Sequence, residues 1–444
     1  METQISEKPT FDTQDEFNRR PIAKNIIRLL TSPIDLSPMV IDGGWGTGKT
    51  EFCQKLIRLM QQQRRNYQPV YIDAFRSDHS GEPLLALLAE IIKTCTPEDT
   101  DGQPSEKRKN ITRKIAKAAG FGIKTVAKAA VGHVLKQNTD DLAEEFQQIM
   151  NDGQDADSLA ETVTDAAATI ASHTIDATVE ALLKEQIEAE KNLGTLKACL
   201  KELAADKPII LFIDELDRCR PDYAVDMLEV IKHVFDVENV KVVLVTNTKQ
   251  LRAAINHRYG MEVDAQKYLD KFLKYSFALP DKIVARFEEE RALVAVEYFK
   301  QLVRSNGIAG ELKGLIEQEI TMDFIRDMIE RNGLSLRETE RLVRFLELFH
   351  SLSRGGLDSQ QMWEYKMLYI MGVFIFCFHP DLIDDINKNR TVKYVRDFTE
   401  NNDYWRIYSA IFRAHLSERG LSEMDGILST LKDTFRVLSL EQTP

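Results

Sequence analysis

The chain has 444 residues, and at roughly 150 residues per domain this length suggests about three structural units. Hydrophobic residues make up 43% of the sequence, and glycine and proline number only 21 and 13, so the chain can form a core and is neither collagen-like nor low-complexity. The net charge of −12 argues against a general nucleic-acid coat, which needs a broad positive field, but it does not exclude a local basic patch.

Cysteine usage and the first residues of the chain predict a cytoplasmic location. The five cysteines form no CxxC pair, so neither a disulfide framework nor a zinc site is indicated. Residues 1–17 are polar and acidic and lack the apolar core of a signal peptide. The longest charge-free run, Met367–Pro380, is too short to span a bilayer as a helix, and we predict that it belongs to a buried helix.

Short apolar strands alternate with amphipathic helices in two separate parts of the chain. The apolar runs predict strands at Pro38–Asp42, Pro69–Ala74, Pro208–Asp214 and Val240–Thr246. Apolar spacing predicts helices at Ala23–Leu30, Thr50–Gln61, Pro83–Lys93 and Tyr223–Phe235. This alternation is typical of βαβ units, so the predicted fold class is α/β with a parallel sheet.

The composition changes between these two parts. Residues 101–136 carry nine Lys or Arg against two acids, whereas residues 137–190 carry fourteen acids and one Lys. Both stretches are rich in alanine and predict helices. The chain looks helical again from about Asp281 onward, with Gly and Asn breaks. We therefore predict an N-terminal segment (1–20), a core first half (21–96), a helical insertion (97–200), a core second half (201–280), a helical lid (281–350) and a C-terminal helical domain (351–444).

Residues 43–50 form the best-defined motif. The sequence GGWGTGKT fits the pattern GxxxxGK[ST] of a phosphate-binding loop, with an apolar strand before it and an amphipathic helix after it. Its glycines allow the backbone N–H groups to point at phosphate oxygens, and the following helix adds its positive end. The predicted nucleotide-binding residues of this loop are Gly43, Gly44, Trp45, Gly46, Thr47, Gly48, Lys49 and Thr50. Lys49 would bridge the β- and γ-phosphates, and the Thr50 hydroxyl would ligate Mg²⁺.

A second motif follows the strand Pro208–Asp214. Asp214 at its carboxyl end predicts a carboxylate that holds Mg²⁺ through water, and Glu215 can polarise an attacking water as a general base. Glu215 could instead be a helix-end charge or an ion-pair partner of Arg218. Asp217 is the rival base, or a capping residue.

Thr246 and Asn247, at the end of the strand Val240–Thr246, give a weaker indication of a nucleotide site. In many P-loop ATPases a polar residue here lies beside the γ-phosphate, and Asn247 is the candidate. A strand-ending turn explains the Thr–Asn pair equally well.

These motifs and their extensions resemble the KAP family of P-loop NTPases. The resemblance rests on GGWGTGKT, on IDELDRCRPDYAVDMLEVIKHVF from Ile213, on YLDKFLKYSFALP (Tyr268–Pro280) and on LSLRETERLVRFLEL (Leu334–Leu348), and PVYIDAFRSD carries Phe75 where the family usually has Trp. It covers roughly residues 15–96 and 200–350. It implies a nucleotide-binding core interrupted by an insertion that in many members holds transmembrane helices.

The insertion of this chain departs from that pattern. Six Lys or Arg interrupt Ile111–Lys136, and each would cost a few kcal/mol at a bilayer centre. We predict no transmembrane span. The stretch could lie on anionic lipid or nucleic acid, or it could pack against the acidic residues 137–190 as a helical module.

The resemblance also suggests arginines that act on nucleotide. Arg337 on the predicted lid could reach the γ-phosphate, with Arg341 and Arg344 as competitors, or it could be a solvated charge paired with a nearby Glu. Arg258 and Lys271 could act in a neighbouring subunit, and Arg218 and Arg220 could build an interface or brace Glu215.

The sequence as a whole predicts Mg²⁺-dependent ATP hydrolysis by Lys49, Asp214 and Glu215, with ATP over GTP resting on the resemblance. The family includes bacterial phage-exclusion proteins, so we expect a switch in anti-phage defence, with a homo-oligomer or an effector protein as partner. The alternatives are an ATP-gated scaffold with little turnover and a nucleic-acid-dependent ATPase.

Overall fold

The computed structural model describes residues 10–13, 15, 17–96, 105–120, 191–284, 291–305, 312–313, 315, 317–357, 362–388, 417 and 422–440. These residues form two compact units. The first lies within Met1–Asp15, Arg19–Gly43 and Lys49–Leu279, and the second lies within Glu16–Asn18, Gly44–Gly48 and Pro280–Pro444.

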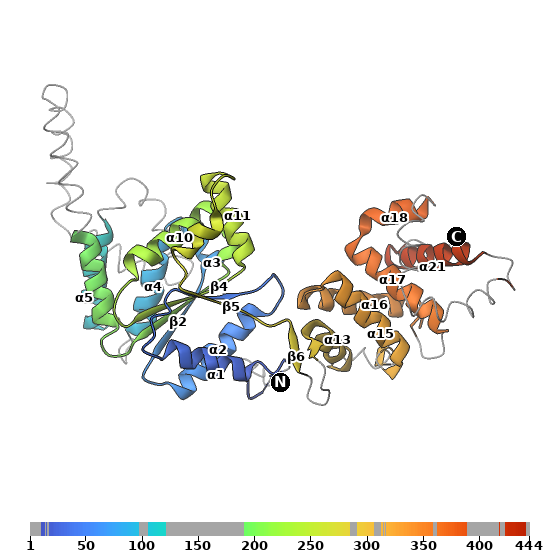
Figure 1. Cartoon of the computed structure of the whole chain (residues 1–444), viewed down its shortest axis with the longest axis horizontal. Helices are drawn as coiled ribbons and strands as arrows, with labels where there is room; N and C mark the ends of the chain where they lie inside the picture. The colour runs from blue at the N-terminus through green and yellow to red at the C-terminus, as the bar shows by residue number, and fades with distance from the viewer. Residues whose placement is uncertain are drawn as a thin grey trace, which may run out of the picture. The chain divides into compact units, whose positions relative to one another are not determined.

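A five-stranded parallel sheet is the centre of the first unit (Figure 1). Its strands are β1 (Met39–Asp42), β2 (Gln68–Asp73), β3 (Ile209–Asp214), β4 (Val240–Thr246) and β5 (Tyr275–Ala278), in the order β2-β3-β4-β1-β5. The register pairs Asp73 with Asp214 and Asp42 with Thr246. Three carboxylates therefore end three strands at one edge of the sheet, the carboxyl edge.

Helices cover both faces of this sheet. They are α1 (Arg20–Leu30), α2 (Lys49–Gln63), α3 (Ala74–Ser77), α4 (Pro83–Cys95), α5 (Glu106–Gly120), α10 (Pro221–Val234), α11 (Thr248–Tyr259) and α12 (Ala265–Asp270), with short 3-10 turns η1 (Asp78–Ser80) and η2 (Leu216–Arg218). Residues 191–203 are also helical. The α/β fold with a parallel sheet is confirmed.

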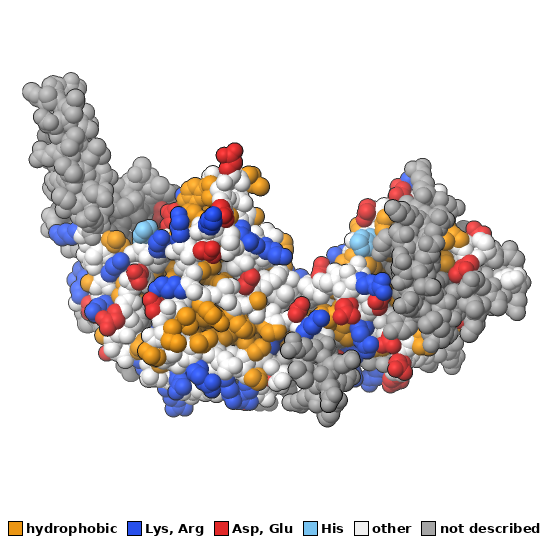
Figure 2. All heavy atoms as spheres, viewed as in Figure 1, with side chains coloured by type: hydrophobic (Ala, Val, Ile, Leu, Met, Phe, Trp, Pro, Cys, Tyr) orange, Lys and Arg blue, Asp and Glu red, His pale blue; other side chains and the backbone are white. Residues whose placement is uncertain are grey.

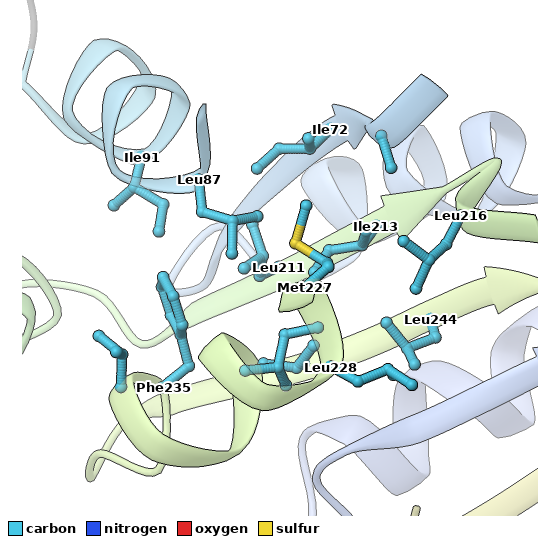
Figure 3. Packing of buried hydrophobic residues seen from close by; sticks show 14 of the residues in the cluster. Ile72, Leu87, Ile91, Leu211, Ile213, Leu216, Met227, Leu228, Phe235 and Leu244 are labelled. Carbon is cyan, nitrogen blue, oxygen red and sulfur yellow. The ribbon is translucent and has the colours of Figure 1, made fainter. Parts of the chain in front are cut away.

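Side chains along β3 point alternately to the two faces of the sheet, and each set packs against the helices on its own face. All six residues of β3 are buried, as expected for a strand covered on both faces. Leu211 and Ile213 pack with α4 and α10, where Leu87 and Met227 meet them (Figure 3). Phe212 points to the opposite face and packs with residues of α1 and α2.

The start of the predicted insertion packs on this same core. Ile111 and Ile115 of α5 are fully buried beside Leu200. Lys114 forms an exposed ion pair with Glu202 at 3.0 Å. Helix α5 thus buries Ile111 and Ile115 in the core of the first unit and exposes Lys114. Its predicted packing against residues 137–190 lies outside the described residues.

Helices dominate the second unit. They are α13 (Val294–Ser305), α15 (Glu319–Asn332), α16 (Leu336–Leu352), α17 (Trp363–Phe378), α18 (Pro380–Asn387) and α21 (Glu423–Leu438). Helix α17 contributes Met367, Ile370 and Phe374 to the core and packs on α16 and α21, which confirms that the charge-free run forms a buried helix. Among the described residues, no helix is both long and apolar enough to cross a membrane.

One prediction for this unit was wrong. The chain is not purely helical after Asp281, because β6 (Lys282–Val284) and β7 (Arg291–Leu293) form a two-stranded antiparallel sheet. Each strand has only three residues, and three residues are too few to show the alternation that identifies a strand in a sequence.

Candidate functional site

The loop that matches the phosphate-binding motif joins β1 to α2 at the carboxyl edge of the sheet. Gly46 and Gly48 have φ of +74° and +81°, a region that favours glycine. The Thr47 hydroxyl donates to the Gly44 carbonyl at 2.9 Å, and the Lys49 ammonium donates to the Gly43 carbonyl at 2.7 Å. The loop therefore folds back on itself, and the Lys49 side chain returns to its beginning.

Lys49 lies in a buried, negatively charged setting. Its exposed fraction is 9%. Burial lowers the pKa of Lys49, whereas the nearby carboxylates of Asp217, Asp214 and Asp42 act to raise it. An ammonium held at low exposure among carboxylates, at the end of a loop of backbone amides, is suited to bind a phosphate group.

Asp214 is the buried carboxylate of the site. It is 1% exposed, and burial raises its pKa from 3.8 to about 6. Three donors act in the opposite direction: the Thr50 hydroxyl, the Glu215 N–H at 2.8 Å and the Tyr71 hydroxyl at 3.1 Å. Burial and the negative charge of Asp214 raise the pKa of Tyr71, which keeps its hydroxyl a donor.

The donor set at Asp214 fits Mg²⁺. Thr50 and Asp214 offer a hydroxyl and a carboxylate oxygen in direct contact, and Mg²⁺ in phosphate sites takes one or two protein oxygens and completes its shell with water and phosphate. Within the described part of the chain there is no group of three or more His, Cys, Asp or Glu side chains that could hold a metal ion on its own.

Glu215 has an unusual backbone and a defined side-chain partner. Its φ of 59° and ψ of 23° place it in the left-handed region, which costs a residue other than glycine about 1–3 kcal/mol. Its carboxylate pairs with Arg218 at 3.0 Å. The ion-pair interpretation of Glu215 is therefore present in the structure, and it is compatible with a role toward water.

Asp217 and Asn247 are tied to neighbouring elements. The buried Thr246 hydroxyl of β4 donates to Asp217 at 3.0 Å. The Asn247 side chain caps α11 by accepting from the Lys249 N–H at 3.1 Å, which leaves its amide N–H groups as donors. Asp42 accepts from both the N–H and the hydroxyl of Thr248 at 2.9 Å, so the residue before the loop holds the start of α11.

Arg337 lies near the start of α16 in the second unit, which also includes Gly44–Gly48. Ser335 caps this helix in a capping box with Glu338, and the Leu336 N–H donates to the Gly46 carbonyl at 3.0 Å. A Cβ added at Gly46 would meet the Ser335 hydroxyl at 2.8 Å. Trp45 is 51% exposed.

Three of the competing cations have other side-chain partners, and the fourth ends a helix. Arg341 lies over the rings of Phe345 and Phe378, and Arg344 pairs with Glu340 at 2.8 Å. In the first unit, Arg258 pairs with Asp226 at 2.5 Å. Lys271 is the C-cap of α12.

Sequence reasoning missed Asp42 and Tyr71. Asp42 had a visible signal, because a carboxylate stands directly before a phosphate-binding loop. Tyr71 had none, because an aromatic residue inside an apolar strand looks like a core residue.

A strand, a GxxxxGK[ST] loop and a helix at the carboxyl edge of a parallel sheet, with an aspartate ending another strand, define a P-loop NTPase domain. The family model described as the KAP family P-loop domain matches residues 19–353. The chain therefore belongs to the KAP family of P-loop NTPases.

Two individual proteins show similarity. The "Phage T7 exclusion protein" of Escherichia coli (strain K12) is 22% identical over 311 residues, which cover 68% of this chain and 38% of that protein. The chain thus matches well under half of its relative. The solved structure of the Aeropyrum pernix ORC2 protein (ADPNP-ADP complexes) aligns over 99% of this chain and 98% of that one at 10% identity, but its TM-score of 0.37 is too low to support any conclusion.

Proposed function

We propose that this chain binds ATP with Mg²⁺ and hydrolyses the γ-phosphate bond. The observation that carries the proposal is the arrangement of Lys49, Thr50 and Asp214 around one end of the loop, with Glu215 next in the chain. Each residue has a distinct part in phosphoryl transfer, so the roles can be separated by substitution.

Binding is assigned to the loop residues Gly43–Thr50. Their backbone N–H groups and the Lys49 ammonium would neutralise the charge of the β- and γ-phosphates. A phosphate group that joins Lys49 would compete with the Gly43 carbonyl for its protons. Thr50 and Asp214 would hold Mg²⁺, which supplies positive charge to the phosphate oxygens when it is bound.

The attacking water is assigned to Glu215. Its carboxylate is less buried than that of Asp214 and follows it directly at the same edge of the sheet, so it can reach a water beside bound phosphate. The Asn247 amide and Arg337 are proposed to respond to the γ-phosphate. Nucleotide state would then set the position of the predicted lid, residues 281–350.

Glu215→Gln tests the hydrolysis. The variant should bind ATP with about wild-type affinity and hydrolyse it at least about a hundredfold more slowly, the scale of a lost general base. Lys49→Ala should lose binding as well, because it removes the charge that faces the phosphates. Normal turnover by Glu215→Gln together with slow turnover by Asp217→Asn would assign the base to Asp217 instead.

We further propose a role in anti-phage defence, together with an effector protein or as a homo-oligomer. Support comes from the similarity to a phage exclusion protein. Phage T7 plating on Escherichia coli that expresses the wild type should fall, and expression of Lys49→Ala at the same level should restore it. Equal plating on both strains, across a panel of phages, would contradict this role.

The net charge of −12 does not favour the nucleic-acid-dependent alternative, because such binding relies on a positive field. On the face of the first unit shown in Figure 2, basic and acidic side chains lie interspersed over α10 and α11, and further basic side chains gather along the lower edge. DNA-stimulated, salt-sensitive ATP turnover would reverse this preference.

A further inference from the structure

Three contacts tie the turn Glu215–Arg220 to the ends of β3 and β4 and to η1. At its start, the Glu215 N–H donates to Asp214. In its middle, Asp217 accepts from Thr246 of β4. At its end, the Arg220 N–H and guanidinium donate to the carboxylate and carbonyl of Asp78, a residue that is 5% exposed. The backbone of this turn therefore has little freedom.

The backbone of Glu215 is also fixed from its carbonyl side. The carbonyl accepts from the Arg218 N–H at 3.1 Å and from the Cys219 thiol at 3.7 Å. Because its left-handed φ and ψ are held from both sides, only side-chain torsions decide where its carboxylate points. A Glu side chain has several such torsions and needs a partner to select one orientation.

Arg218 supplies that partner. Its Nη2 atom lies 3.0 Å from Glu215 Oε1, and the two side chains are 35% and 19% exposed. The Arg218 charge also reaches Lys49, since it acts to lower the pKa of that ammonium. The guanidinium is thus near enough to Lys49 for its charge to act there, and it starts from a backbone that is itself hydrogen-bonded on both sides.

We propose that Arg218 is a positioning residue for ATP turnover: its ion pair fixes the orientation in which the Glu215 carboxylate meets the attacking water. The proposal rests on the proposed function, since it requires that Glu215 act in hydrolysis. It assigns no contact between Arg218 and the nucleotide. Its signature is therefore a loss of kcat without a comparable loss of ATP binding.

Arg218→Gln in the full-length chain is the first test. We expect kcat to fall by about tenfold, part of the 10²–10⁴-fold contribution of a base, while the KM for ATP and the Kd of ATP in the Glu215→Gln background change less than about twofold. Arg218→Lys should recover part of the loss, because one ammonium N–H can replace the single Nη2 contact. The matched control is Arg326→Gln, which breaks another i,i+3 pair, with Asp323 at 2.6 Å, and should leave kcat unchanged.

A double-mutant cycle separates positioning from a structural role. Adding Arg218→Gln to Glu215→Gln should cause no further loss of turnover, because the carboxylate that it orients is already absent. An independent further loss, or a melting temperature well below that of Arg326→Gln, would indicate a structural role and overturn the proposal. So would an unchanged or increased kcat in Arg218→Gln, or an equal loss of kcat and ATP affinity.

The possible failures can be told apart. If the wild type does not hydrolyse ATP, or if Glu215→Gln hydrolyses it normally, the proposed function fails and the role of Arg218 fails with it. If Glu215→Gln is inactive while Arg218→Gln matches Arg326→Gln, only the positioning role is overturned.

Discussion

Asp214→Asn should make the nucleotide-free protein more stable at neutral pH, although it should impair catalysis. Burial raises the pKa of the Asp214 carboxyl from 3.8 to about 6 in the folded chain. The folded state therefore binds more protons than the unfolded state between these two values. The ionised carboxylate, which prevails at neutral pH, is thus a source of instability in the folded chain.

The magnitude follows from the two pKa values. The favourable contribution of a protonated Asp214 is complete below the unfolded pKa and is lost as pH rises through the folded pKa. The resulting penalty on the wild type is about 1 kcal/mol at pH 4.5 and about 3 kcal/mol at pH 7.5. Asparagine is never ionised and can bond the same Tyr71, Thr50 and Glu215 groups, since hydroxyls accept as well as donate.

Urea unfolding of wild type and variant, followed by circular dichroism without Mg²⁺ or nucleotide, measures the effect. The advantage of Asp214→Asn in the free energy of unfolding should grow by about 2 kcal/mol from pH 4.5 to pH 7.5. Asp264→Asn is the control, because the Lys267 N–H at the start of α12 lowers the pKa of Asp264 below 3.8; this carboxylate is ionised at both pH values, so its variant should show almost no change in relative stability between them. An advantage of Asp214→Asn that is the same at both pH values would refute the reasoning.

Two further predictions concern single contacts. Tyr71→Phe removes one of the three donors to Asp214. A hydrogen bond to a charged group contributes about 1.4 kcal/mol, so the Mg²⁺ concentration for half-maximal turnover should rise about tenfold. An unchanged Mg²⁺ titration would contradict this. Gly372→Ala should cost about 1–3 kcal/mol in urea unfolding, because the added Cβ would meet the buried Thr434 side chain at 2.8 Å, whereas Gly194→Ala meets nothing within 4 Å in a helix and should be neutral or stabilising.

The four central strands could be predicted from the sequence almost to the residue. Strands β1 to β4 lie within one residue of the predicted bounds, because burial on both faces requires short, continuous apolar runs. Strand β5 could not be found in this way. Its residues Tyr275–Ala278 are mostly exposed at the edge of the sheet, so no apolar run marks it.

The residues of the candidate site could be predicted where a motif fixes the residue types. The contacts that arise because the sheet places distant strands side by side could not be predicted. The loop Gly43–Thr50 and Asp214 could be proposed because phosphate chemistry requires those residue types at those places. The bonds from Tyr71 to Asp214 and from Thr246 to Asp217 join residues 143 and 29 positions apart, and only the pairing of neighbouring strands creates them.

The structure also distinguishes between the two carboxylates, Glu215 and Asp217, that could act as the general base. In the sequence, Glu215 and Asp217 stand two residues apart after a predicted strand, and either carboxylate could act as the general base. The buried Thr246 hydroxyl holds Asp217 against β4, and among the carboxylates that raise the pKa of Lys49 the charge of Asp217 has the largest effect, so its contacts support a role in aligning the lysine. The partner of Glu215 is Arg218, which contacts its Oε1 atom at 3.0 Å, so the second carboxylate oxygen can face a water while the ion pair stays intact. Because a base must exchange protons with water while an anchor must not move, these different partners favour Glu215 as the base and Asp217 as the anchor.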